Sequence, residues 1–283
     1  MKLKLIAPKC GVGQATNLYP PYVLATLAGL TPPDIEVVIE DQNIKDIDYD
    51  EPVDLVGITV IVHTASNAFK IADEYRRRGI TVFMGGVFVE ACPEECLKHA
   101  DSVILCEVEQ IWKDILADYF SGNYKQRYEL SERPDIAGLP LPRHDLVKNP
   151  KYLTNNLIMI SKGCLNRCLF CSGGSHWKGQ VKTRNIDDVI KEIQSLDMNE
   201  PYFILDDNLI WNAEFAKEIF KALIPLKIHW ICSGACVDSV EDKELIQLAK
   251  ESGCLAMLLG FETVNEKTLK NSSKGFNKVE NYP

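Results

Sequence analysis

The amino-acid sequence predicts an α/β protein built from two tandem domains. Short apolar runs rich in Val and Ile alternate with stretches of helical periodicity through residues 1–122. The alternation stops in a stretch with many loop signals, 123–155, and resumes over 156–283. Three cysteines directly follow the first apolar run of this second part. We therefore expect a doubly wound, flavodoxin-like domain, a linker, and a partial parallel β/α barrel with a site at its first loop.

The composition limits the classes of function. The chain has 283 residues, 46% of them hydrophobic and 25% charged, and a net charge of -9, which argues against nucleic acid or a membrane surface as a partner. No apolar run approaches the ~18 residues that a membrane-spanning helix needs. Ten cysteines without the pattern of a secretion signal indicate a reducing compartment, so we expect a cytoplasmic protein whose clustered thiols serve metal or redox chemistry.

Five short strands are expected in the first domain, with the apolar character of strands buried on both faces. They are Leu3–Ala7, Ile35–Glu40, Asp54–Val60, Ile80–Met84 and Ser102–Leu105. Helices are predicted to begin near Pro20, Ser66, Pro93 and Gln110. Ligands of such sheets bind beyond the carboxyl ends of the strands, which makes the residues at those ends the candidate site.

The second part repeats the pattern with four strands, each followed by a helix. The strands are Leu157–Ile160, Tyr202–Leu205, Ile228–Ser233 and Leu255–Gly260, and the helices are expected to follow the N-cap residues Asn185, Asn212, Ser239 and Asn265. Four β/α units do not close a barrel. We therefore expect the sequence to be a shortened protein or a fragment, truncated before its last units.

The cysteine loop has the spacing C-x3-C-x2-C, with Cys164, Cys168 and Cys171 inside eight residues. A structural zinc site needs four ligands, and His176 is the available fourth one, but a second pair of ligands is missing. A 4Fe–4S cluster held by three thiolates leaves one iron open to a substrate or cofactor. Three thiolates on one short loop favour the cluster over zinc.

The loop resembles the signature of radical S-adenosylmethionine enzymes, with Phe170 as the aromatic residue before the last cysteine. In that family the open iron binds the amino and carboxylate groups of S-adenosylmethionine, and the cluster donates the electron that produces a 5'-deoxyadenosyl radical. The first domain resembles the cobalamin-binding domain of one subfamily. Further similar stretches are Met84–Val87, Pro93–Glu95, Gly138–Arg143, Asp206–Asn208 and Leu259–Thr263.

The resemblance assigns roles in the second domain residue by residue. Cys164, Cys168 and Cys171 match the cluster ligands, and Phe170 matches the position whose backbone lies near the adenine. The stretch Asp206, Asp207 and Asn208 stands where relatives approach the methionine amino group, to which carboxylates are suited by charge. Glu262 matches a position that faces S-adenosylmethionine or substrate. At Cys236 the chain departs from an Arg that is common in the family.

In the first domain, Thr59 matches the hydroxyl residue near the cobalamin nucleotide tail. Gly85 and Gly86 match the place where the backbone comes close to that tail. His63 is either a cobalt ligand or a residue on the cobalamin face, or else it has a surface or capping role. Glu107 follows the last strand, after Cys106 where relatives have Gly. The Asp-x-His-x-x-Gly motif that supplies a lower cobalt ligand is absent from the first loop, so a His ligand from that loop is not expected.

The resemblance implies an enzyme that uses a 4Fe–4S cluster, S-adenosylmethionine and cobalamin. Its expected reaction is methylation of an unactivated carbon in a small-molecule, lipid or peptide substrate, with an electron donor such as a flavodoxin or ferredoxin. Two alternatives stay open. One is a radical cyclisation or rearrangement with the same cofactors, and the other is a fragment that binds a cluster without turnover.

Overall fold

The computed structural model describes residues 1–10, 19–105, 107–236 and 241–282. The chain divides into two compact units. The first comprises Met1–Pro134 and Leu139–Asn155, and the second comprises Asp135–Gly138 and Asn156–Pro283. Each is described by itself below.

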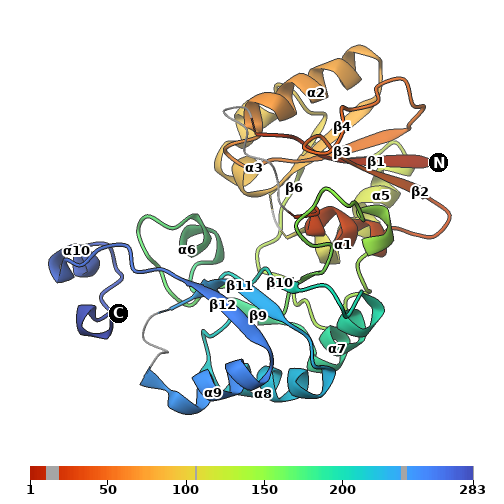
Figure 1. Ribbon diagram of the computed structural model, residues 1–283. Coiled ribbons are helices and arrows are strands. Elements are labelled where there is room, and N and C mark those ends of the chain that lie inside the picture. Colours follow the sequence, from red (N-terminus) through yellow and green to blue (C-terminus); the bar gives the residue numbers. More distant parts are fainter. Residues whose placement is uncertain (11–18, 106, 237–240, 283) are drawn as a thin grey trace. The chain divides into compact units, whose positions relative to one another are not determined.

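A six-stranded parallel sheet forms the centre of the first unit, in the order β2-β1-β3-β4-β5-β6 (Figure 1). The strands are β1 (Lys2–Ala7), β2 (Glu36–Asp41), β3 (Leu55–Thr59), β4 (Thr81–Gly85), β5 (Ser102–Ile104) and β6 (Arg127–Tyr128). The five predicted strands are confirmed within a residue or two at each end. Strand β6 was not predicted, because two residues are too few to show a periodicity.

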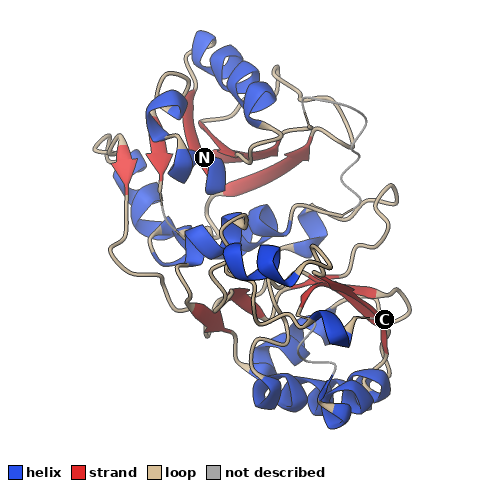
Figure 2. Ribbon diagram, turned by 90° about the vertical axis from the view of Figure 1, so that its left-hand side faces the viewer, coloured by secondary structure: helices blue, strands red, loops and turns tan. Residues whose placement is uncertain are grey.

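The two faces of this sheet carry separate apolar cores, as alternation along buried strands requires. On one face Ile6, Val56 and Met84 pack with helix α2 (Ala65–Arg77). On the other, Leu5 and Phe83 pack with α1 (Tyr22–Leu30) and α5 (Trp112–Phe120). Helices on both faces confirm the doubly wound fold (Figure 2). The remaining helices of the unit are α3 (Val87–Ala91), α4 (Pro93–Cys96), η1 (Val108–Gln110) and η2 (His144–Leu146).

The segment expected to be a linker is largely part of the first unit. Its β6 pairs with β5, and the backbone N–H of Arg143 donates to Ala25 at 2.9 Å. Farther on, the hydroxyl of Tyr152 donates to the carboxylate of Asp41 at 2.8 Å, and both residues are buried. Most of the segment 123–155, which the sequence predicts as a linker, thus packs within the first unit, and Asp135–Gly138 belongs to the second unit. Loop residues mark only the absence of regular structure and not the absence of packing.

The second unit contains a four-stranded parallel sheet in the order β12-β11-β10-β7. Its strands are β7 (Leu157–Ile158), β10 (Tyr202–Ile204), β11 (Trp230–Ala235) and β12 (Cys254–Leu259). The connecting helices are α7 (Ile186–Ser195), α8 (Ala213–Leu223) with η3 (Ile224–Leu226), α9 (Lys243–Glu251), α10 (Glu266–Asn271) and η5 (Val279–Asn281). The four predicted β/α units are confirmed.

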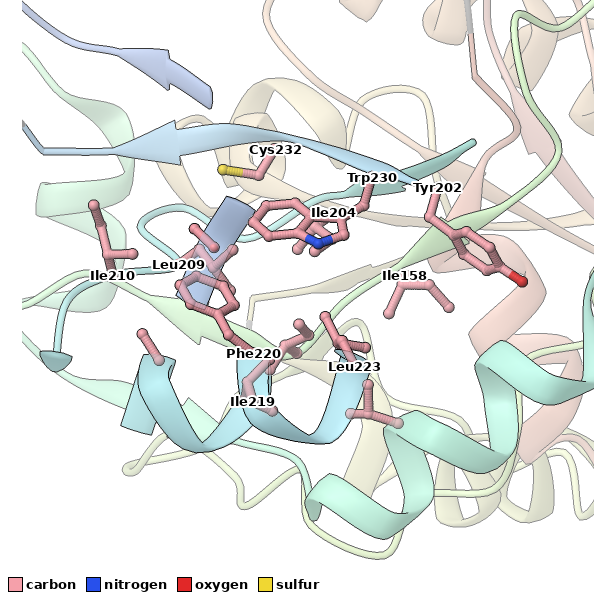
Figure 3. Packing of buried hydrophobic residues seen from close by; sticks show 14 of the residues in the cluster. Ile158, Tyr202, Ile204, Leu209, Ile210, Ile219, Phe220, Leu223, Trp230 and Cys232 are labelled. Atoms are coloured by element: carbon pink, nitrogen blue, oxygen red, sulfur yellow. The ribbon is translucent and has the colours of Figure 1, made fainter. Parts of the chain in front are cut away.

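The core of the second unit lies between this sheet and helices α7, α8 and α9. Figure 3 shows Trp230 of β11 above Phe220 of α8, whose ring centroids are 5.3 Å apart and nearly parallel. The indole N–H of Trp230 donates to the backbone oxygen of Ser252 at 3.1 Å. Since both rings are buried and the polar N–H is satisfied, this pair fixes α8 against the sheet.

Two of the four predicted N-cap residues accept a capping hydrogen bond within the described residues. Asn212 accepts from Phe215, and Asn265 accepts from Thr268, each at 3.0 Å. Asn185 occupies the N-cap position of α7 but makes no capping bond. The cap of α9 is Asp242, whereas the predicted cap, Ser239, lies outside the described residues.

A short antiparallel pair of strands on either side of the cysteine loop was not predicted. Strand β8 (Ser161–Gly163) pairs with β9 (Val181–Thr183), and the cysteine loop and helix α6 (Ser172–Trp177) lie between them. The hairpin closes the cysteine loop at its base. Among the helices in the described ranges, none combines the length and the apolar character needed to cross a bilayer.

Candidate functional site

The cysteine loop leaves strand β8 through Gly163. This residue has φ 97°, and a Cβ there would stand 2.3 Å from the backbone oxygen of Gln180. Only glycine fits such a position without strain. The loop then turns tightly, with the N–H of Cys171 donating to the oxygen of Cys168 at 3.0 Å. The close approach of the hairpin strands therefore explains why glycine precedes Cys164.

The three thiols differ in burial but influence one another electrostatically. Cys168 is buried, Cys164 is half-buried and Cys171 is exposed. Burial raises the pKa of the Cys164 and Cys168 thiols, and the other two thiols of the loop raise the pKa of Cys168 further. The nearby Lys274 ammonium acts in the opposite direction on the pKa of Cys168. The three thiols therefore differ in exposure although they belong to one short loop.

The donor set of the loop consists of three thiols within eight residues. Each thiolate of such a set can bind a separate iron of a cubane, which leaves the fourth iron open. Within the residues that the structure describes, no three or more His, Cys, Asp or Glu side chains form a group that could hold a single metal ion. His176, the alternative zinc ligand, packs edge-on against Trp177. The residues present therefore fit a three-thiolate 4Fe–4S site.

Asp206 lies directly beneath the loop but faces inward. Its carboxylate accepts hydrogen bonds from the backbone N–H groups of Ile160 and Ser161 at 2.8 and 2.7 Å, and from the Ser161 hydroxyl. It is only 1% exposed, and burial raises its pKa to about 7. The sequence predicted a contact with an ammonium group. In the structure Asp206 instead accepts hydrogen bonds from the backbone at the start of the hairpin, because the buried N–H groups there need an acceptor.

Asp207 and Asn208 reach the cysteine loop itself. Asp207 is exposed, and its carboxylate accepts from the N–H of Gly163 at 2.9 Å. Asn208 is buried, and its side-chain nitrogen lies 3.9 Å from Sγ of Cys164 and 3.2 Å from Sγ of Cys236. Among the residues that the structure describes, its oxygen Oδ1 has no hydrogen-bond partner. Of the three predicted residues, these two are the ones that the structure brings to the thiols.

Cys236 is a further residue of this environment. It follows strand β11, and its sulfur also receives a hydrogen bond from the side chain of Asn166 at 3.4 Å. Asn166 stands inside the cysteine loop, between the first two cysteines. The sequence singled out Cys236 only as a departure from the family pattern, and its position beside the loop is decided by the sheet.

Glu262 lies at the other side of the loop and is paired with Lys274. The carboxylate oxygen and the ammonium nitrogen are 2.6 Å apart. Lys274 is buried and also stands 5.7 Å from the centre of the Phe170 ring, a cation–π distance. Lys274 was missed by the sequence prediction, because a lysine in a polar C-terminal stretch carries no pattern that marks it as buried.

In the first unit the predicted residues gather at the carboxyl ends of β3, β4 and β5. Thr59 is the register partner of Gly85. A Cβ on Gly85 would make only an ordinary contact, whereas one on Gly86, at φ 114°, would stand 2.6 Å from the oxygen of Val60. The sequence predicted that the backbone at both glycines comes close to a bound cofactor. Packing within the protein itself requires a glycine at Gly86 but not at Gly85.

An apolar surface surrounds this edge of the first sheet. Ile61, Val62 and Val87 are exposed by 45%, 67% and 40%. His63 is exposed in the same loop as Val62, and Glu107 stands at the start of η1. Cys106 and the first loop, residues 11–18, lie outside the described residues.

Comparisons with known proteins agree with the site in the second unit. Residues 158–281 match the model of the Radical SAM superfamily. Two methyltransferases of Chlorobaculum tepidum, for bacteriochlorophyllide d C-12(1) and C-8(2), are each 29% identical to the chain, over 81% and 92% of its length. The chain spans only 52% and 61% of those two proteins.

The fold is also similar to a solved structure. The radical S-adenosylmethionine methyltransferase TsrM from Kitasatospora setae, with cobalamin and a [4Fe-4S] cluster bound, superposes with a TM-score of 0.77 over 99% of this chain and 65% of that one. The sequence identity is 17%, so this likeness concerns the fold. The superfamily match, together with the three thiols on the loop after β8, implies a 4Fe–4S cluster and S-adenosylmethionine as cofactors. Residues 158–281 are therefore similar in sequence to the radical SAM superfamily, and the cysteine loop lies within this match.

Proposed function

We propose that the protein acts as a cobalamin-dependent radical S-adenosylmethionine methyltransferase on a small-molecule substrate. The observation that carries the proposal is the cysteine loop, where three thiols within eight residues follow strand β8, shortly after the first parallel strand β7 and within the residues that match the Radical SAM superfamily. The doubly wound unit that precedes these residues supplies a second place for a cofactor. The methyltransferase names of the two Chlorobaculum relatives support methyl transfer as the outcome.

Cys164, Cys168 and Cys171 would hold the cluster, which supplies the electron that cleaves S-adenosylmethionine. The surrounding residues shape the loop. Gly163 allows the close backbone turn, and Asp207 fixes that glycine through its N–H. The amide of Asn208, directed at Cys164, stabilises negative charge on the sulfur.

Cobalamin would bind to the first unit and carry the methyl group. Thr59 and Gly85 lie side by side at the strand ends, and Gly85 leaves ordinary space for a close-lying ligand. The exposed apolar surface of Ile61, Val62 and Val87 suits the face of a large macrocycle. His63 and Glu107 are the polar side chains that we assign to the same edge.

The substrate class and the electron source belong to the proposal as well. The named substrates of the relatives, bacteriochlorophyllides, are small molecules, and the acidic chain disfavours nucleic acid. Cleavage of S-adenosylmethionine needs one electron from outside, for which a flavodoxin or ferredoxin in a reducing, cytoplasmic setting is suited.

Anaerobic reconstitution tests the cluster. The wild-type chain is expected to take up about four irons and to form 5'-deoxyadenosine after reduction. Cys168→Ala should lose both properties, while Cys92→Ala, in the first unit, serves as the matched control that keeps them. Stoichiometric zinc in place of iron, or unchanged 5'-deoxyadenosine with Cys168→Ala, would contradict the assignment.

A second experiment separates methyl transfer from other radical outcomes. Cobalamin is added to the reconstituted chain and the corrinoid spectrum is recorded after removal of free cofactor. Retention of the corrinoid by the wild type and its loss on substitution of Val62 by Asp would support the assignment of the first unit. With a candidate substrate, a product heavier by one methyl group indicates methylation, whereas a product of altered hydrogen count alone indicates cyclisation.

A further inference from the structure

The ammonium group of Lys274 is an unusual feature of the radical SAM domain. Its side chain is 8% exposed, although a lysine is rarely buried without a specific partner. Its backbone N–H donates to the oxygen of Leu269 in α10 at 2.8 Å, and its ammonium lies beside Phe170 of the cysteine loop. The chain therefore keeps a positive charge out of water next to the cluster ligands.

One side-chain contact and one backbone hydrogen bond connect the segment of Lys274 with the cysteine loop. The nitrogen Nζ stands 5.7 Å from the ring centre of Phe170, which is the neighbour of Cys171. The N–H of Leu169 donates to the backbone oxygen of Ser272 at 3.0 Å, so the two segments are also joined through their backbones. The electrostatic influence of Lys274 reaches Cys168 directly.

Glu262 opposes this charge from the solvent side. Its carboxylate is 2.6 Å from Nζ and 39% exposed, and its backbone has φ 63°, a conformation that costs energy in a residue with a side chain. Gly260 makes room for the pair, since a Cβ there would stand 2.6 Å from Nζ of Lys274 and 2.8 Å from the Glu262 oxygen. The Glu262 carboxylate, carried by a residue with a strained backbone, therefore lies next to the buried Lys274 ammonium. The two opposite charges both lie near the cysteine loop.

We propose that Lys274 and Glu262 form an electrostatic pair that sets the reduction potential of the cluster held by the cysteine loop. The inference rests on the proposed function, since it requires the cluster to bind there. Reduction adds one negative charge to a 4Fe–4S cluster, and nearby charge is one of the factors that set its potential. The buried ammonium favours the reduced state, and the more exposed carboxylate offsets part of this effect. Lys274 is thus a positioning residue for electron entry and does not itself react.

The test measures the potential of the reconstituted chain without S-adenosylmethionine, by anaerobic redox titration followed through absorbance and electron paramagnetic resonance. Lys274→Met should lower the ratio of reduced to oxidised cluster at a fixed potential at least tenfold, which is about 59 mV for one electron. Glu262→Gln should shift the potential in the opposite direction. Lys274→Arg keeps the charge and should restore the wild-type value. Lys267→Met, which removes an exposed charge from α10, is the matched control and should change little.

The opposite signs distinguish an electrostatic role from a structural one. Loss of packing would move the two variants in the same direction or release the iron from both. If Lys274→Met does not fold, Glu262→Gln decides: a raised potential supports the pair, and an unchanged one overturns it. A reducible wild-type cluster with unchanged variants overturns this inference alone, whereas a wild type that takes up no cluster overturns the proposed function and this inference with it.

Discussion

The side-chain nitrogen of Asn208 stands 3.2 Å from Sγ of Cys236 and 3.9 Å from Sγ of Cys164. One buried amide therefore connects a predicted cluster ligand with a cysteine from the next strand. The amide nitrogen donates to both sulfur atoms, and its oxygen has no hydrogen-bond partner within the described ranges. The side-chain nitrogen of Asn208 is thus a hydrogen-bond donor to sulfur. Hydrogen bonds to the sulfur atoms are one of the factors that set the reduction potential of an iron–sulfur cluster.

We expect Asn208→Leu to fold with a free energy of unfolding within about 1 kcal/mol of the wild type, because the replacement also removes the buried oxygen that lacks a partner. Its cluster should bleach faster in the presence of an iron chelator. The decay of the charge-transfer absorbance measures this directly. Asn199→Leu, an exposed asparagine of the same unit, is the control. Equal decay rates for wild type and Asn208→Leu would show that the amide does not act on the cluster.

Asp206 should be among the residues most important for the stability of the second unit. Asp206→Ala leaves two buried backbone N–H groups and one hydroxyl without an acceptor, and each such group costs about 1–3 kcal/mol. We expect a loss of at least about 3 kcal/mol in the free energy of unfolding, measured with denaturant at pH 6. Asp187→Ala, which removes an exposed carboxylate from the first turn of α7, should cost less than about 1 kcal/mol.

The raised pKa of Asp206 also predicts a pH dependence. The carboxyl group titrates at about 7 in the folded protein because burial disfavours its charge, against 3.8 ordinarily. The folded state therefore holds the proton more tightly than the unfolded state. Its contribution to stability is fully present below pH 3.8 and is lost as the pH rises through about 7.

Asp206→Asn removes this titration and checks the prediction. The stability of the wild type relative to the variant should fall between pH 4 and pH 7 and then level off, as followed by denaturant unfolding at several pH values. A difference between the two proteins that stays constant over this range would contradict the raised pKa.

In the first unit, Gly86 and Gly85 should respond differently to substitution. Gly86→Ala places a Cβ 2.6 Å from the oxygen of Val60 at a positive φ, so we expect a loss of about 1–3 kcal/mol in thermal or denaturant unfolding. Gly85→Ala makes only a contact of 3.7 Å with Ile104 and should keep the stability within about 1 kcal/mol. A corrinoid bound weakly to Gly85→Ala but normally to the wild type would support a ligand close to this residue. Equal destabilisation by both variants would contradict the distinction.

The sequence by itself determined the nine predicted strands, their order in two parallel α/β units, and the cysteine loop. These features are local. Strand burial shows in runs such as Leu3–Ala7, and Cys164, Cys168 and Cys171 share a loop because only a few residues separate them. The comparisons confirm the radical SAM domain that this spacing and its context indicated.

Only the tertiary structure decided which side chains face the loop. Asp206 and Asp207 are neighbours in sequence, yet one turns inward to the backbone of Ser161 and the other stays exposed beside Gly163. Lys274 and Cys236 lie near the loop although they belong to distant segments of the sequence. No local sequence pattern predicts such contacts. The same reason explains the missed strand β6, whose two residues acquire their structure from pairing with β5. Periodicity records how a segment is buried, whereas the partner that buries it is chosen by the fold as a whole.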